Sequence, residues 1–106
     1  MKINEEFLFN DLISNKVLFF NFMKEKYPFY KDSNIFFRDL QFAIKSFFEK
    51  KEIIISSITS QKLAENLIFS LENKQEIKRI SNNAWNVLFS LNYGVNITTP
   101  DNNKNE

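Results

Sequence analysis

The feature that most constrains this chain is a change of periodicity between two neighbouring segments of its second half. In the first, Leu63, Leu67 and Leu71 recur at the four-residue spacing of one face of an α-helix. In the second, residues 84–91, apolar side chains alternate with smaller or more polar ones, which is the spacing of a half-buried strand. The pattern therefore predicts a helix over residues 59–74 that leads directly into β structure.

That β structure is predicted to be a two-stranded hairpin. Residues 76–80 carry Lys78 and Arg79 between two isoleucines, a pattern typical of a short and exposed strand. Asn82 and Asn83 provide the turn, because asparagine adopts left-handed backbone at modest cost. Asparagine has to take this role because the whole chain contains one Gly and two Pro.

Two short helices are expected at the N-terminal end. Residues 4–26 contain no Gly or Pro, yet their apolar side chains would point in nearly every direction on one straight helix. A break at Ser14-Asn15-Lys16 resolves this and gives helices over residues 4–13 and 16–26, with Asn4 as the N-cap of the first. Both helices then need neighbours that cover their apolar faces.

A longer central helix is predicted over residues 34–50, with Asp32 or Ser33 as its N-cap. It has one wide apolar face and a second, smaller one that includes Phe42. Either this helix lies between two neighbours, or Phe42 belongs to an exposed patch that binds a partner. Residues 53–55 are consecutive isoleucines, and their β-branched side chains predict an extended segment, with a short strand against the hairpin as one form that it can take.

Together these elements predict an α+β fold that is mostly helical, with three to four helices followed by a C-terminal β-hairpin. The chain has 106 residues, which suits one small domain, expected over residues 1–94. Thirteen Phe allow so short a chain to build a large core, since aromatic side chains bury a large apolar area. Residues 95–106 are polar and contain Pro100, so we expect them to form a disordered tail.

Composition argues against several classes of function. The chain has no His and no Cys, which removes the commonest general base, the commonest metal ligand and any thiol chemistry. Its carboxylates are scattered, so we expect no catalytic site, no cofactor and no metal site. The longest unbroken apolar run, residues 17–20, is far too short to cross a membrane, and the N-terminus lacks a signal-peptide pattern. A cytoplasmic protein is therefore expected.

The order of the elements resembles that of winged helix-turn-helix domains, in which a pair of helices is followed by a two-stranded wing. The resemblance covers about residues 16–91 and concerns the order of elements, not a sequence motif. It implies that residues 59–74 form the second helix of the pair and residues 80–84 the wing. The contact residues that it implies lie on the outer face of that helix and on the hairpin: Lys62, Glu65, Asn66, Phe69, Asn73, Lys78 and Arg79.

Two functions are compatible with this resemblance. Many winged helices bind DNA, for which Lys62, Lys78 and Arg79 are the available phosphate contacts. The net charge of +1 and the presence of Glu65 and Glu72 on the same face favour the other function, a non-catalytic module that docks onto a protein partner within a larger assembly. Phe69 projects away from the leucine stripe and is the expected anchor. The N-terminal helices, which are dense in Phe, are a further expected interface, between two copies of the chain.

Overall fold

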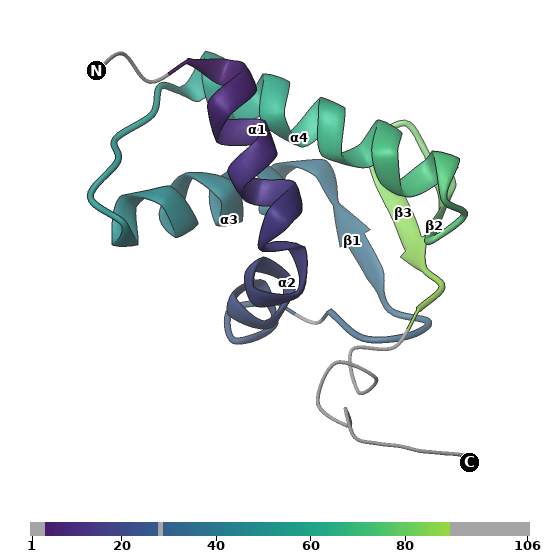
Figure 1. Ribbon diagram of the computed structural model, residues 1–106. Coiled ribbons are helices and arrows are strands. Elements are labelled where there is room, and N and C mark those ends of the chain that lie inside the picture. Colours follow the sequence, from purple (N-terminus) through teal and green to yellow (C-terminus); the bar gives the residue numbers. More distant parts are fainter. Residues whose placement is uncertain (1–3, 28, 90–106) are drawn as a thin grey trace.

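The structure is a computed structural model that describes residues 4–27 and 29–89. The described part contains four helices and a three-stranded antiparallel sheet (Figure 1). In chain order the elements are α1 (Glu5–Ser14), α2 (Lys16–Lys24), β1 (Asn34–Phe36), α3 (Phe37–Lys50), α4 (Ser57–Asn73), β2 (Ile77–Ser81) and β3 (Ala84–Val87). The predicted fold class, mostly helical α+β with a hairpin after the last helix, is confirmed. The predicted tail, residues 95–106, lies outside the described residues.

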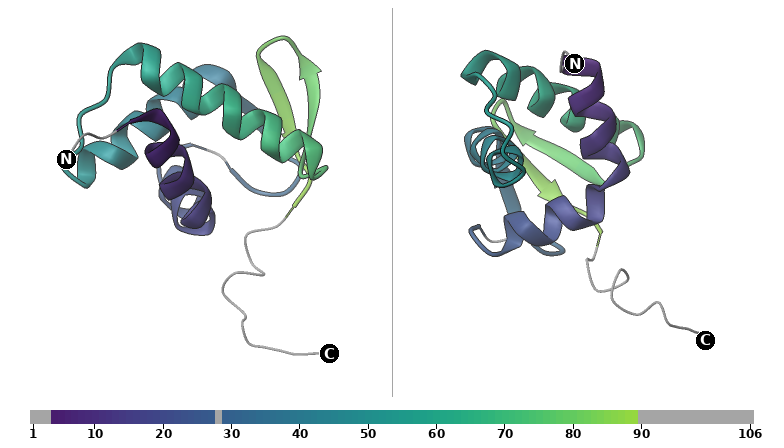
Figure 2. Two further views of the ribbon diagram at one scale, coloured as in Figure 1. Left: turned by 45° about the horizontal axis from the view of Figure 1, so that its top comes forward. Right: turned by 60° about the vertical axis from the view of Figure 1, so that its left-hand side comes forward.

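Helix α4 has the buried face that its leucine spacing predicts. Leu63, Leu67 and Leu71 are fully buried, and both α1 and α3 pack against this helix. The hairpin lies beside the C-terminal part of α4 (Figure 2). The N-terminus of α4 is capped by Ser56, whose hydroxyl oxygen accepts a hydrogen bond from the backbone N–H of Thr59 at 3.0 Å. With one face buried and the N-terminus capped, α4 presents its opposite face outward along its whole length.

The hairpin forms as predicted and belongs to a larger sheet. Strands β2 and β3 pair antiparallel around a turn at Asn82 and Asn83, and β1 pairs with the other edge of β3, so the strand order is β1-β3-β2. Strand β3 ends at Val87, earlier than expected; the last two positions of the predicted strand, residues 90–91, lie outside the described residues. In the central strand, Trp85 is opposite Arg79 on one side and Ile35 on the other.

Strand β1 corrects the predicted start of the central helix. Residues 34–36 are extended, not helical, because Ile35 is buried opposite Trp85 and is only 2% exposed. The Asn86 side-chain amide fastens this edge by donating to the backbone oxygen of Ser33 at 3.3 Å. The predicted N-cap is also wrong: Phe36 occupies that position, and the Ser33 hydroxyl instead donates to a backbone oxygen in the preceding turn.

The strand predicted over residues 53–55 is not formed. These isoleucines link α3 to α4, and the backbone N–H of Ile53 closes the end of α3 by donating to the Phe48 oxygen at 2.9 Å. The chain reverses direction at Glu52, which has a positive φ of 64°. Ile55 is buried but Ile54 is 78% exposed, so the segment is fixed at its ends and contributes no strand to the sheet.

The core is rich in Phe, as the composition predicts. Buried side chains from all four helices and all three strands form one apolar cluster. Its aromatic part joins α2 and α3 to the segments that precede β1 and follow β3. The rings in contact are those of Phe19, Phe20, Phe29, Phe47, Phe48 and Phe89. The leucine face of α4 closes this cluster on one side.

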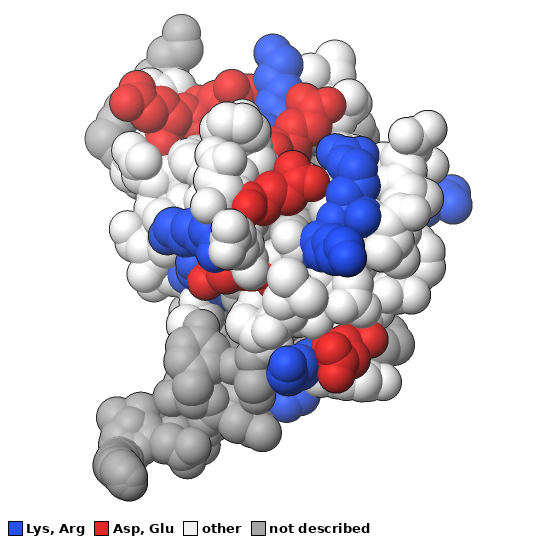
Figure 3. All heavy atoms as spheres, turned by 90° about the vertical axis from the view of Figure 1, so that its right-hand side faces the viewer, with Lys and Arg blue, Asp and Glu red and all other residues white. Residues whose placement is uncertain are grey.

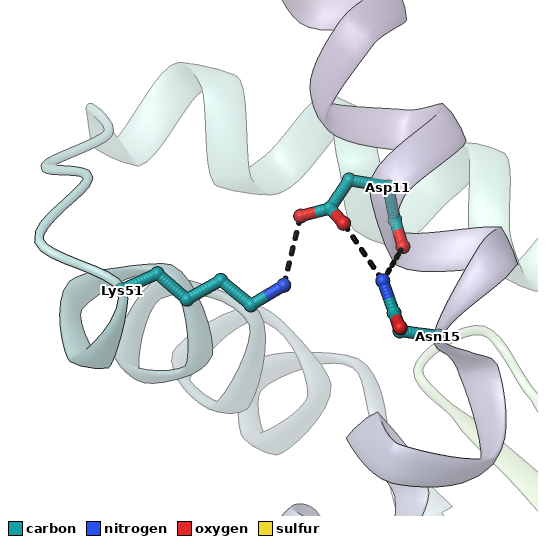
Figure 4. A network of polar contacts seen from close by, with 3 residues as sticks. All are labelled: Asp11, Asn15 and Lys51. Atoms are coloured by element: carbon teal, nitrogen blue, oxygen red, sulfur yellow. Dashed lines mark hydrogen bonds and ion pairs between the residues drawn. The ribbon is translucent and has the colours of Figure 1, made fainter.

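The predicted break between the first two helices is confirmed at Asn15. Its side-chain amide donates to the backbone oxygen of Asp11 at 2.9 Å and to the carboxylate of the same residue at 2.7 Å. The second carboxylate oxygen of Asp11 accepts from Lys51, just after α3, at 2.9 Å (Figure 4). Asn4 caps α1 as predicted, by accepting the backbone N–H of Phe7. The end of α1 is thereby tied to the end of α3, and α1 is held against α4.

Candidate functional site

The outer face of α4 carries five of the seven predicted contact residues. They recur at helical spacing on the side opposite the buried leucines and are all exposed: Lys62, Glu65, Asn66, Phe69 and Asn73. Phe69 stands out among them, because its large aromatic side chain is 66% exposed. The two remaining residues, Lys78 and Arg79, lie on β2. The helix thus presents one exposed aromatic ring within a polar surface.

A groove separates this face from the hairpin. We call it the hairpin groove; its walls include Phe37, Glu65, Phe69, Glu72, Arg79 and Trp85, and its volume is about 380 Å³. Ile68 and the turn residues Asn82 and Asn83 complete the lining. The groove combines aromatic surface with two carboxylates and one guanidinium, so it offers both apolar and polar contacts.

Three residues of the hairpin groove, Glu72, Arg79 and Trp85, are bound to one another. The indole N–H of Trp85 donates to Oε2 of Glu72 at 2.8 Å, and Nε of Arg79 lies 3.5 Å from the same oxygen. The Arg79 guanidinium also covers the Trp85 ring at 4.8 Å and donates to the backbone oxygen of Asn82 at 3.3 Å. These contacts fasten the hairpin to α4, and they engage the cation of Arg79 within the molecule.

A second groove lies on the other side of Phe69. We call it the α1 groove; it is lined by Phe9 and Ile13 of α1 and by Asn66, Phe69 and Asn73 of α4, and its volume is about 440 Å³. Ser70 and Lys74 complete this lining. Phe69 therefore forms a ridge between two hollows, both of them walled by apolar side chains from other elements.

The predicted cations do not converge on one surface. Strand alternation places the Lys78 side chain on the opposite face of the sheet from Arg79, which points toward α4. Lys62 lines neither groove. On the hairpin side of the molecule, basic and acidic side chains are interspersed and broad areas carry no charge (Figure 3). The structure thus brings together Glu65, Phe69 and Arg79 in one groove, and Asn66, Phe69 and Asn73 in the other.

Sequence reasoning missed part of the hairpin groove. Glu72 lies one helical turn beyond Phe69 and two turns beyond Glu65, so helical spacing alone places it on the same face. Phe37 belongs to α3 and Trp85 to β3, and only the packing of these elements beside α4 brings the two residues to this face. The spacing signal places Glu72 on the outer face, although the predicted contact residues leave it out, and it cannot find Phe37 and Trp85.

The described residues contain neither a metal-binding cluster of side chains nor a helix that could span a membrane. Nowhere in residues 4–27 and 29–89 do three or more acidic side chains gather in a way that could hold a metal ion. Within the same ranges, every helix is too short or too polar to cross a bilayer.

Comparison of the chain with protein-family models, with curated proteins and with solved structures finds no match in any of the three. The class that the fold defines is a small α+β domain with an exposed aromatic ridge between two grooves. Any functional conclusion therefore depends on the chemistry of that surface.

Proposed function

We propose that this chain is a non-catalytic interaction module that docks onto a protein partner within a larger assembly, through the α4 face centred on Phe69. The observation that carries this proposal is the position of Phe69, 66% exposed on a ridge between two partly apolar grooves. An aromatic side chain in such a place loses its contact with water only when a partner covers it. Buried aromatic anchors of this kind supply most of the binding energy in protein interfaces.

The order of the elements supports a winged-helix-like assignment. Helices α3 and α4 form a consecutive pair, and the β2–β3 hairpin follows the second helix in the place of the wing. Winged-helix domains include protein-docking modules as well as DNA-binding ones, which is what the resemblance contributes. In this assignment α4 is the helix that meets the partner, and the hairpin is the second wall of the binding site.

Charge favours docking over the alternative, a winged-helix DNA-binding regulator. A DNA-binding surface needs cations that are available to phosphate groups. Here the guanidinium of Arg79 is engaged by Glu72, and Lys78 lies on the other face of the sheet. Glu65 and Glu72 both line the groove beside Phe69, where they would repel phosphate. A protein surface with mixed charge fits this site better than a polyanion does.

The test is site-specific photo-crosslinking in the protein's native cell. A photoreactive residue replaces Phe69 in one variant and Lys78 in a matched control, because both positions are exposed but only the first lies on the α4 face. We expect discrete crosslinked protein products from position 69 and none of the same products from position 78. Identical products from both positions, or none from position 69, would contradict docking through this face.

A companion variant, Phe69→Ala, separates binding from folding. Because two thirds of the Phe69 side chain is exposed, its removal should lower the free energy of unfolding only slightly. The same substitution should abolish the complex with the partner that position 69 crosslinks. Circular dichroism during urea unfolding measures the first quantity and co-purification of the crosslinked partner measures the second. If Phe69→Ala unfolds the protein, the ring belongs to the core and the docking site is elsewhere.

A further inference from the structure

We infer that the hairpin groove receives a segment of the partner that presents a large apolar side chain next to a Lys or Arg. This inference rests on the proposed docking function and specifies the chemistry of the partner. The apolar side chain follows from the residues that line the groove, and the neighbouring Lys or Arg follows from the charge of those residues. Each of these is visible in the contacts of the groove-lining residues.

The apolar part of the inference comes from the floor and walls of the groove. Trp85 and Ile68 are buried beneath it, and the Phe69 and Phe37 rings flank it. The volume of about 380 Å³ is within the range of about 300–1,000 Å³ that is typical of small-ligand pockets. An aromatic or long aliphatic side chain entering here would cover the exposed ring of Phe69 and displace water from apolar surface.

The charge of the groove selects the neighbour of that side chain. Three charged residues line it, and two of them, Glu72 and Arg79, pair with each other at 3.5 Å. Among the described residues Glu65 makes no ion pair; its carboxylate accepts only a 3.3 Å hydrogen bond from Gln61. The groove therefore carries one uncompensated negative charge, and a cation of the partner compensates it.

The position of that charge also sets a direction. Glu65 precedes Glu72 by two helical turns of α4, a rise of roughly 10 Å along the helix axis. The uncompensated carboxylate therefore lies at the end of the groove nearer the N-terminus of α4. On the other side of the Phe69 ridge, the charged residue that lines the α1 groove is Lys74, of opposite sign. A basic segment is thus favoured on the hairpin side of Phe69 and disfavoured on the α1 side.

The test uses short random peptides displayed on phage and selected against the full chain, with prior subtraction on the Phe69→Ala variant. We expect the selected peptides to share a large apolar residue flanked by Lys or Arg. Synthetic versions of these peptides are then titrated by fluorescence anisotropy. Glu65→Lys should weaken their binding about tenfold or more, since it places like charges together in the site. Glu65→Gln should weaken it less, because it removes the attraction without adding repulsion.

The matched control is Glu49→Lys, which changes the net charge by the same amount at an exposed position of α3 that does not line the groove. Its affinity for the peptides should equal that of the unaltered chain. Peptides that depend on Phe69 but are acidic or uncharged would overturn this inference and leave the docking function standing. A selection without any peptide that depends on Phe69 would overturn both.

Discussion

Glu72 is the residue on which the geometry of the candidate site depends. Its Oε2 atom accepts the indole N–H of Trp85 at 2.8 Å and lies 3.5 Å from Nε of Arg79. Trp85 is only 2% exposed, so without Glu72 its N–H would lose a protein acceptor in a place with little access to water. A single carboxylate thus satisfies a buried donor and orients the cation that covers the ring.

We predict that Glu72→Ala lowers the free energy of unfolding by about 1–3 kcal/mol, the usual cost of leaving a buried donor unsatisfied. The matched control is Glu65→Ala on the same helix, whose carboxylate makes one hydrogen bond at the surface and should cost less than about 0.5 kcal/mol. Urea unfolding followed by far-ultraviolet circular dichroism measures both. Equal losses for the two variants would show that the Trp85 contact contributes nothing.

For single residues, the sequence predicts the face that a side chain occupies better than the partners that it contacts. The outward direction of Phe69 follows from helical spacing against Leu63, Leu67 and Leu71, and the structure agrees. The engagement of Arg79 could not be predicted, because it depends on the hairpin register that sets Arg79 opposite Trp85. Local periodicity fixes which side of an element a residue occupies, whereas its partners are chosen by the packing of separate elements.

At the scale of the elements, β1 shows where local pattern is overridden. Residues 34–36 continue the apolar spacing of α3, and this made one long helix the simplest prediction. Pairing with β3, some fifty residues further along the chain, draws Ile35 into the core, so α3 begins only at Phe37. The isoleucines at 53–55 show the opposite error: their strand propensity predicts a strand, but the segment links α3 to α4 and pairs with none of β1, β2 and β3.

The two isoleucine sites give a direct test of this assignment. We predict that Ile35→Ala lowers the free energy of unfolding by about 2–5 kcal/mol, because it removes buried methyl and methylene groups and leaves a cavity beside Trp85. The same substitution at Ile54, which is 78% exposed, should change it by less than about 0.5 kcal/mol. Urea denaturation of both variants is the measurement. A larger loss at Ile54 would favour the strand that the sequence predicted there.

The N-terminus of α4 offers a second test at this scale. We predict that Ser56→Ala lowers the free energy of unfolding by about 1 kcal/mol, because the backbone N–H of Thr59 loses its acceptor. Ser57→Ala, one position along, should be nearly neutral, since Ser57 is the first residue of the helix and its hydroxyl makes no cap bond. The two thermal unfolding curves provide the comparison. The prediction fails if the two serines prove equivalent.

For the whole molecule, the expected contact between two copies through the N-terminal helices remains a proposal. Five large apolar side chains of α1 and α2 are buried, namely those of Leu8, Leu12, Phe19, Phe20 and Met23. Phe7 and Leu18 are the exposed ones that could form such an interface. We predict a concentration-dependent dimer in sedimentation velocity experiments that Leu18→Lys weakens without loss of stability. Sedimentation as a monomer at every concentration would remove this interface.

A titration against duplex DNA tests the alternative function, DNA binding. We expect the chain to show no salt-dependent affinity for random duplex DNA, because the cation of Arg79 is engaged and two carboxylates line the groove. Fluorescence anisotropy at low ionic strength is the measurement, with Lys62→Ala as the comparison variant. Binding that falls steeply with salt, and that Lys62→Ala weakens, would restore the DNA-binding alternative.

Trp85 is the one tryptophan of the chain. Its ring lies under Arg79 and its N–H is bound by Glu72, and all three residues border the same groove. When a guest enters that groove, the electric field and hydration around a single chromophore change, so the emission maximum of the protein should shift. The intrinsic fluorescence of Trp85 therefore reports whether the hairpin groove is occupied, without any added dye or tag.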